Sequence, residues 1–132
     1  MFQKIDLLTK AMNASWKRNE VISNNIANAN TPSFKKSVVV FEDLLQDYLK
    51  STTLKGFNTH KAHIEIGPQN PKELQHKVET TGGYSTRRDA NNVDIDVEMA
   101  ELAKNQIVYN TLTTQMNSHF QRLRIAINEG KR

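Results

Sequence analysis

Two stretches of this chain place apolar or small side chains at alternating intervals of three and four residues, and this spacing constrains the fold more than any other feature. A repeat of this kind marks one face of a long helix that packs against another helix. The first stripe predicts a helix from about Lys4 to about Ala29, ended by Thr31, which precedes Pro32. Its inward positions are Ile5, Leu8, Met12, Ser15, Asn19, Ile22, Ile26 and Ala29, widened on one flank by Ala11, Ala14 and Val21.

The second stripe is longer and keeps the same alternation across four heptads without a slip. It predicts a helix from about Asp94 to about Glu129, roughly 50 Å long at 1.5 Å per residue. Acidic residues in the first turn and Gly130 after the last turn suit the two ends of a helix. Its inward positions are Ile95, Met99, Leu102, Gln106, Tyr109, Thr113, Met116, Phe120, Leu123 and Ile127.

The sixty or so residues between the stripes have a different character, because glycines and prolines interrupt them repeatedly. We expect mostly loop, with a short helix near 41–50 and short strands such as 62–66 and 78–81. The predicted fold is mainly α: an antiparallel pair of long terminal helices, coiled-coil-like, with a loop-rich and partly β insert. This divides the chain into an amino-terminal helix (1–30), an insert (31–93) and a carboxy-terminal helix (94–132).

Polar residues dilute both stripes at inward positions, namely Ser15 and Asn19 on the first and Gln106 and Thr113 on the second. Such positions weaken a helix pair and set its register. Since two helices bury only one stripe each, we expect the pair to lie near the folding threshold until neighbouring copies cover its other faces. An ordinary helical hairpin core is the alternative interpretation of the same periodicity.

Two motifs narrow these alternatives. The run VISNNIANANTPSFK (21–35) resembles the amino-terminal signature of the bacterial flagellar axial family, the rod and hook proteins. The run DANNVDIDVEMAELAKN (89–105), followed by Tyr109 and by residues 120–127, is similar to the carboxy-terminal part of the same family. Ser33 and Ala90 stand where the family commonly has glycine, and Val97 where a basic residue is usual. The motif residues are Asn24, Asn25, Asn28, Asn30, Thr31, Pro32, Asn91, Asn92 and Asp94.

The resemblance implies a structural subunit of the flagellar rod, the driveshaft that passes torque from the rotor ring to the hook and encloses the export channel. The short insert and the run 120–127 favour the proximal type of subunit, and a sister rod protein is the alternative. The implied partners are other copies of the chain, other rod proteins, and rotor-ring adaptor and export-gate proteins. The implied location is the periplasmic rod of the basal body, reached through the flagellar type III apparatus without a cleaved signal peptide. The first residues indeed contain no classical secretory signal.

Assembly of such a rod needs exposed helix faces, and we expect the two stripes to supply them. The Asn residues of the first motif are expected either to bridge helices or simply to end the first helix. Early export substrates of this kind carry a Phe-x-x-x-hydrophobic element; Phe41 with Leu45 fits it, as does Phe34 with Val38, and plain packing is the alternative for both. The expected assembly seam is Ile5, Leu8, Met12, Ile22, Ile26, Met99, Leu102, Tyr109, Met116, Phe120, Leu123 and Ile127.

Composition excludes several other classes of protein. The chain has no cysteine, and its apolar runs fall short of the roughly 20 residues that a membrane span needs, so we expect no disulfide, no thiolate metal site and no direct membrane insertion. His60 and His63, with His76 further on, lack a third ligand at a convincing spacing. The acids at 94, 96 and 98 lack the glycine and the distal glutamate of a calcium loop, so we interpret them as helix-start residues. We expect no catalytic residues, no cofactor and no enzymatic activity.

The rival from another functional class is a basic helical nucleic-acid-binding protein. The net charge of +4, the pI of about 9.4 and the pairs Lys35-Lys36 and Arg87-Arg88 prompt it. A binder of that kind clusters its cations on one face and often interleaves stacking aromatics. Here the basic residues are spread along the chain and alternate with acids, so we expect no nucleic-acid partner.

Overall fold

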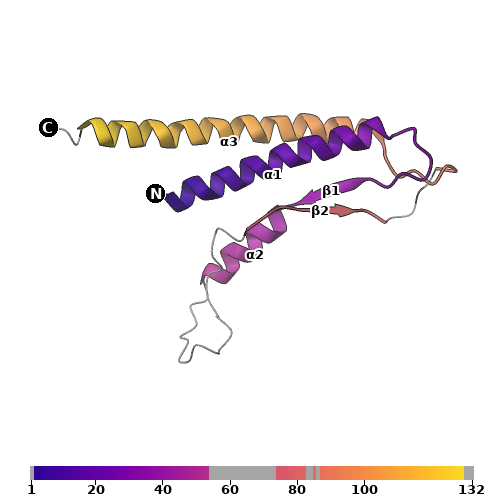
Figure 1. Ribbon diagram of the computed structural model, residues 1–132, viewed down its shortest axis with the longest axis horizontal. Helices are drawn as coiled ribbons and strands as arrows, with labels where there is room; N and C mark the ends of the chain where they lie inside the picture. Colours follow the sequence, from indigo (N-terminus) through magenta and orange to yellow (C-terminus); the bar gives the residue numbers. More distant parts are fainter. Residues whose placement is uncertain (1, 54–73, 83–84, 86, 130–132) are drawn as a thin grey trace, which may run out of the picture.

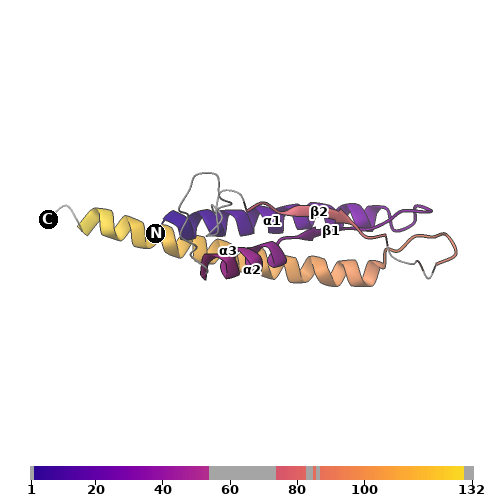
Figure 2. The same cartoon turned by 90° about the horizontal axis from the view of Figure 1, so that it is seen from below.

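The computed structural model describes residues 2–53, 74–82, 85 and 87–129. It contains the helices α1 (Phe2–Ala27), α2 (Glu42–Thr53) and α3 (Ile95–Glu129) and the strands β1 (Ser37–Val40) and β2 (Lys77–Thr80). The long helices α1 and α3 lie side by side and run in opposite directions, with the two ends of the chain near one end of the molecule (Figure 1). The strands lie along α1, with β1 on the side nearer to α3 (Figures 1 and 2). The expected fold class is therefore confirmed.

The predicted stripe of the first helix is the face of α1 that other parts of the chain cover. All eight of its positions are buried or half-buried, and Ser15, Ile22 and Ala29 are the most enclosed. The widening flank is buried as well, since Ala14 and Val21 are almost inaccessible to solvent. The helix ends at Ala27, two residues before the expected boundary, because the following residues form turns, with the Ala29 N–H donating to the Ile26 carbonyl at 3.1 Å.

Helix α3 begins at Ile95 because the Asp94 side chain caps it. The Asp94 carboxylate accepts hydrogen bonds from the backbone N–H groups of Asp96 at 3.0 Å and Val97 at 3.4 Å, which have no partner within the helix. At 1.5 Å per residue α3 is about 52 Å long and α1 about 39 Å. Helix α3 therefore extends past the start of α1, as Figure 1 shows.

The covered face of α3 differs from the predicted stripe. Half of the predicted positions are exposed, and residues next to them in the sequence are covered instead. The buried or half-buried side chains are Glu98, Leu102, Asn105, Tyr109, Leu112, Thr113, Met116, Ser118, His119 and Leu123. The predicted positions that are exposed in the single chain are Ile95, Met99, Gln106, Phe120 and Ile127. Several of these positions, such as 98 and 105, hold polar side chains, so a search for apolar periodicity selects the apolar neighbour Met99 in place of Glu98.

The insert forms a two-stranded antiparallel sheet and a short helix that pack on α1. Val39 pairs with Val78 in the register of the two strands. The strand predicted at 78–81 is confirmed with a shift of one residue, the helix predicted near 41–50 is confirmed with an extension to Thr53, and β1 was not predicted. The strand predicted at 62–66 and the histidines at 60 and 63 lie outside the described residues. A small core joins Ala14, Phe41 and Leu74, with Leu7, Ala11, Leu44, Leu45 and Tyr48 packed around it.

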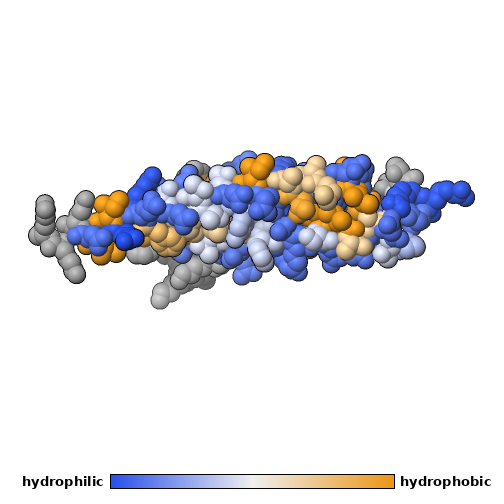
Figure 3. All heavy atoms as spheres, turned by 90° about the horizontal axis from the view of Figure 1, so that it is seen from above, coloured by the Kyte–Doolittle hydropathy of each residue, from blue (hydrophilic) through white to orange (hydrophobic). Residues whose placement is uncertain are grey.

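The outer surface of the long helices is mixed in character. Seen from the α3 side, hydrophobic surface gathers on the half of the molecule that contains the start of α3, with a smaller area near its carboxy-terminal end (Figure 3). Within the described residues, none of the helices combines the length and the apolar character that crossing a bilayer requires.

Candidate assembly surface

The two sequence motifs meet at one end of the helix pair, where the Asn91 side chain caps α1. Asn91 is completely buried, and its amide nitrogen lies 2.9 Å from the Asn28 carbonyl oxygen, 3.0 Å from that of Ala29 and 2.9 Å from that of Thr31. Its side-chain oxygen accepts a hydrogen bond from the Val93 N–H at 2.7 Å. One amide therefore joins the turns that follow α1 to the segment that leads into α3.

A second buried amide, Asn25, joins α1 to both of its neighbours. Its nitrogen donates to the Ser37 carbonyl at 2.9 Å and to the Glu98 carboxylate at 3.0 Å, and its oxygen accepts from the Ser37 N–H at 3.0 Å. The Glu98 carboxylate also pairs with the Lys36 ammonium at 3.6 Å. Glu98 lies in the first turn of α3, as predicted, and it is also buried and links α3 to α1 and to the residue before β1.

A third polar contact lies halfway along the helix pair. The Ser15 hydroxyl donates to the side-chain oxygen of Asn105 at 2.8 Å, and the Asn105 amide donates back to the Ser15 carbonyl at 2.9 Å. Both residues are buried. Because each donor and acceptor has a partner only in this alignment, the contact fixes the register of α1 against α3.

The remaining motif asparagines have local roles. Asn92 joins the insert to the approach of α3, since its oxygen accepts from the Lys36 N–H at 2.7 Å and its nitrogen donates to the Thr81 carbonyl at 3.0 Å. Asn28 donates to the carbonyl and the side chain of Asn24 within the last turns of α1. Asn24 and Asn30 are exposed. Bridging therefore describes Asn25 and Asn91, and helix termination describes Asn28.

Ser33 and Ala90 adopt the left-handed backbone conformation that the family's glycines favour. Their φ angles are 61° and 57°, and they are the positive-φ residues other than glycine in the described part of the chain. The two turns are joined, because the Ser33 N–H donates to the Asp89 carbonyl at 2.8 Å and the Lys35 ammonium donates to the Ala90 carbonyl at 2.8 Å. A side chain at such a position carries a steric penalty that glycine avoids.

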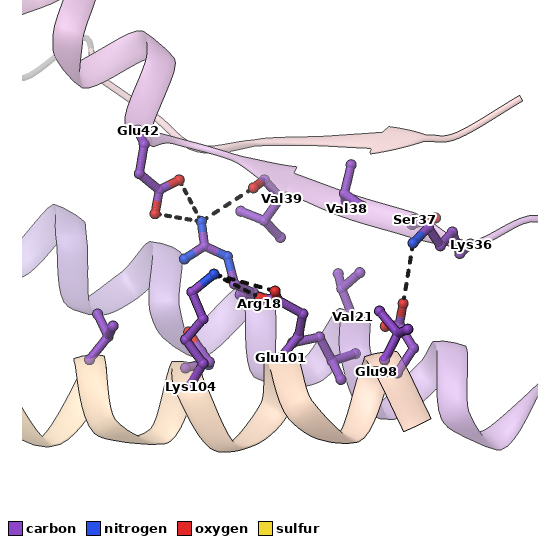
Figure 4. A pocket seen from close by; sticks show the side chains of 14 residues that line it. Arg18, Val21, Lys36, Ser37, Val38, Val39, Glu42, Glu98, Glu101 and Lys104 are labelled. Atoms are coloured by element: carbon purple, nitrogen blue, oxygen red, sulfur yellow. Dashed lines mark hydrogen bonds and ion pairs between the residues drawn. The ribbon is translucent and has the colours of Figure 1, made fainter. Parts of the chain in front are cut away.

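A groove of about 530 Å³ opens between α3 and β1, with α1 behind it (Figure 4). Its rim carries three ion pairs made within the chain: Arg18 with Glu42 at 2.6 Å, Lys36 with Glu98 at 3.6 Å, and Lys104 with Glu101 at 3.3 Å. Its apolar lining comes from Val21, Ile22, Val38, Val39, Val97 and Val108. The interior of the groove is therefore largely apolar. Its edge is close to neutral, because each of the three cations is paired with a carboxylate.

The Glu42 carboxyl at the edge of the groove has a lowered pKa. Burial by itself raises the pKa of the Glu42 carboxyl, but the hydrogen bond and charge of Arg18 and backbone hydrogen bonds at the start of α2 outweigh it. The net effect is a pKa below the ordinary value of 4.5. The carboxylate form is therefore the one that holds Arg18 between α1 and α2.

Large apolar side chains remain exposed along α3 and beside it, and sequence reasoning found some of them. Met99, Phe120 and Ile127 of the predicted seam are each more than half exposed. Trp16 is 64% exposed and was not among the predicted residues. Among the described residues, no group of three or more acidic or histidine side chains is arranged to hold a metal ion.

The candidate export-gate element is part of the folded core. Phe41 is buried against Ala14 and Leu74, and Leu45 packs against this cluster. Phe34 is half-buried and Val38 is exposed at the groove. Packing accounts for Phe41 and Leu45 in the folded chain, and the export role stays a prediction.

An elongated helix pair, held at one end by buried amides and with large apolar side chains exposed along α3, is typical of a structural subunit that packs into an assembly. The family model described as "Flagella basal body rod protein" matches residues 5–35. The chain is 35% identical over 127 residues to flagellar basal body rod protein FlgB of Bacillus subtilis (strain 168), covering 96% of this chain and 95% of the relative. It is 32% identical to the FlgB protein of Borrelia hermsii, covering 93% and 94%, and 30% identical to that of Aquifex aeolicus (strain VF5), covering 84% and 82%.

The chain belongs to the family of flagellar basal body rod protein FlgB. It is accordingly a structural subunit of the proximal rod of the flagellar basal body. These relatives favour the proximal subunit over a sister rod protein and over a nucleic-acid-binding protein.

Proposed function

We propose that the chain assembles side by side with copies of itself and with other rod proteins to form the wall of a hollow shaft. This wall encloses the export channel and transmits torque from the rotor ring to the hook. The observation that carries the proposal is the row of apolar side chains left exposed on α3, including Met99, Phe120 and Ile127. Exposed apolar surface in heptad register is the surface that a neighbouring helix covers.

The geometry of α3 supports this role. Counting back thirteen residues from Ser15 reaches the start of α1 at Phe2, and counting forward thirteen from Asn105 reaches Ser118. Residues after Ser118 therefore have no residue of α1 opposite them, although Phe120 and Leu123 continue the apolar pattern. A helix end of this kind gains stability when another subunit packs on it.

The predicted seam divides between two tasks. Ile5, Leu8, Met12, Ile22 and Ile26 lie on the stripe that α1 turns toward α3, so they stabilise the subunit itself. Met99, Phe120 and Ile127 are available to neighbours, whereas the half-buried Leu102 and Tyr109 and the buried Met116 line the helix pair. Leu123 is half-buried but lies past the start of α1.

The same proposal includes the finer predictions about partners and location. Rotor-ring adaptor and export-gate proteins contact the subunit at one end of the rod, in the periplasmic part of the basal body, and the chain is exported without a cleaved signal peptide. Because Phe41 and Leu45 are packed in the folded core, an export gate reads them only while the chain is unfolded. The core of the wall is 1–30 with 94–132, the insert 31–93 faces outward, and the role is structural rather than catalytic.

Sedimentation and circular dichroism of the purified chain over a wide concentration range test the proposal. We expect helix content and particle size to rise together, because the end of α3 becomes ordered when another subunit covers it. A chain that is compact, melts cooperatively and shows neither change with concentration would overturn it.

A further inference from the structure

The largest exposed aromatic side chain of the described residues lies beside the seam between the long helices. Trp16, the chain's single tryptophan, is 64% exposed, and its ring centre is 6.4 Å from that of Tyr109 at a tilt of 50°. Tyr109 supports one side of the indole, and the rest of it faces solvent. A protruding aromatic side chain held by a second aromatic ring is typical of the anchors at protein interfaces.

The groove and this aromatic knob, Trp16 with Tyr109, open on opposite flanks of the helix pair. On α3, Asn105 lies between them and borders both the groove and the hollow beside Trp16. On α1, Trp16 and Asn19 lie on one side of the buried Ser15, and Arg18 and Val21 lie on the other, as the helical repeat requires. A subunit therefore presents the knob to one lateral neighbour and the groove to the other.

The interior of the groove matches an indole in chemistry. Val38, Val97 and Val108 are between 38% and 49% exposed there, so a guest side chain would cover apolar surface that water now touches. Arg18, Lys36 and Lys104 stand at the rim (Figure 4), and cations of this kind stack favourably on an indole face. Each is already paired with a carboxylate of its own chain, so an uncharged guest leaves no charge unpaired.

We propose that Trp16 of one copy inserts into the groove of a second copy, between α3 and β1. The contact joins two different surfaces of the same chain, so it repeats from subunit to subunit around the wall rather than closing into a two-fold dimer. This inference rests on the self-assembly proposed above and names the lateral interface through which it occurs.

The test compares self-association of the full chain, measured by sedimentation equilibrium, with that of three variants. Trp16→Ala removes the knob, and Val38→Glu places a charge in the groove. Val78→Glu is the matched control, because Val78 lies on the partner strand, is similarly exposed and does not line the groove. We expect the first two changes to weaken association about 30-fold or more, as loss of an interface anchor does, and the control to have no effect.

Mixing the two interface variants gives the decisive result. Val38→Glu still carries the knob, and Trp16→Ala still carries the groove, so an equimolar mixture should form one-to-one pairs that do not grow further. The only tryptophan in the mixture belongs to the Val38→Glu chain, and its emission should shift to the blue and lose accessibility to iodide as pairs form.

Wild-type association that both variants leave unchanged would overturn the Trp16 contact and leave the proposed function standing. Loss of association in Val38→Glu alone would also overturn it, since the groove would then hold a different segment. A wild-type chain that stays monomeric at every concentration would overturn both the contact and the proposed self-assembly.

Discussion

Ser15 and Asn105, which are 90 positions apart in the sequence, exchange two hydrogen bonds in the buried middle of the helix pair. In the described structure, these are the hydrogen bonds that the two side chains make, and both would break if one helix slid along the other. The pair thus determines how far the end of α3 projects beyond α1, and with it which apolar side chains remain for assembly.

We predict that Asn105→Leu lowers the free energy of unfolding by about 1–3 kcal/mol, because it leaves the buried Ser15 hydroxyl without a partner. The double variant Ser15→Ala, Asn105→Leu should recover much of that loss, since both polar groups are then gone. Urea denaturation of the two single variants and the double variant measures the coupling energy. Additive losses would show that the two side chains act independently.

Asn91→Ala is expected to be among the most destabilising single changes in the loops. It removes a buried side chain that contacts the carbonyls of Asn28, Ala29 and Thr31 and accepts from the buried Val93 N–H, and the loss should be about 1–3 kcal/mol, because that N–H loses its partner. The control is Asn30→Ala at an exposed motif position, for which a change within about 0.5 kcal/mol is expected. Equal effects at the two positions would contradict the capping role.

Glycine at position 33 or 90 should stabilise the chain. The backbone there has φ of 61° and 57°, which costs an L-residue roughly 1–2 kcal/mol relative to glycine, offset in part by the greater freedom of glycine in the unfolded chain. Ser33→Gly and Ala90→Gly should therefore each raise the free energy of unfolding by up to about 1 kcal/mol. The same change at the exposed helical position Ser23 should lower it by a similar amount. Thermal melts of the three variants give the comparison.

The Arg18–Glu42 contact should contribute to stability in a pH-dependent way. The folded-state pKa of Glu42 lies below its ordinary value of 4.5, so the contribution is fully present above pH 4.5 and is lost as the pH falls through the lowered folded value. The effect should be small, because the Glu42 side chain is largely exposed. Denaturation curves from pH 7 to pH 3 should show a shallower loss for Glu42→Gln than for the wild type, and identical slopes would refute the assignment.

Phe120→Asp should abolish rod assembly while leaving the subunit folded, because Phe120 is exposed and lies on the part of α3 that extends past the start of α1. Leu123→Asp should also block assembly. Met116→Asp is the contrasting variant: it buries a charge in the helix pair and should unfold the chain. Motility of a strain that carries each variant, with circular dichroism of the purified protein, separates the two effects. Normal motility with Phe120→Asp would contradict the role given to this surface.

The amino-terminal helix shows how much periodicity can predict. All eight predicted positions of its stripe are covered. Most of them, such as Ile5, Leu8 and Ile22, are apolar, so their burial follows from their apolar character and their helical spacing. The ends of both long helices were also predictable within about two residues, since Asp94 and the Thr31-Pro32 step act locally.

The carboxy-terminal helix shows where that reasoning stops. Its contact face includes Glu98 and Asn105, which are buried because Asn25 and Ser15 supply hydrogen bonds from another helix. A scan of one segment assigns such residues to the solvent side, since burial of a polar group depends on a partner that is distant in sequence. For the same reason Asn25 and Asn24, neighbours in one motif, have different roles: one points into the pair and the other to solvent.

The sequence alone determined that two long helices form, where they begin and end, and that they carry more apolar surface than one pair can cover, because these properties arise from local periodicity and capping. Only the tertiary structure decided which flank of α3 faces α1, that β1 borders a groove beside α3, and that Trp16 is left exposed on the opposite flank. Those outcomes depend on hydrogen bonds between residues 60 to 90 positions apart, and no local pattern encodes them.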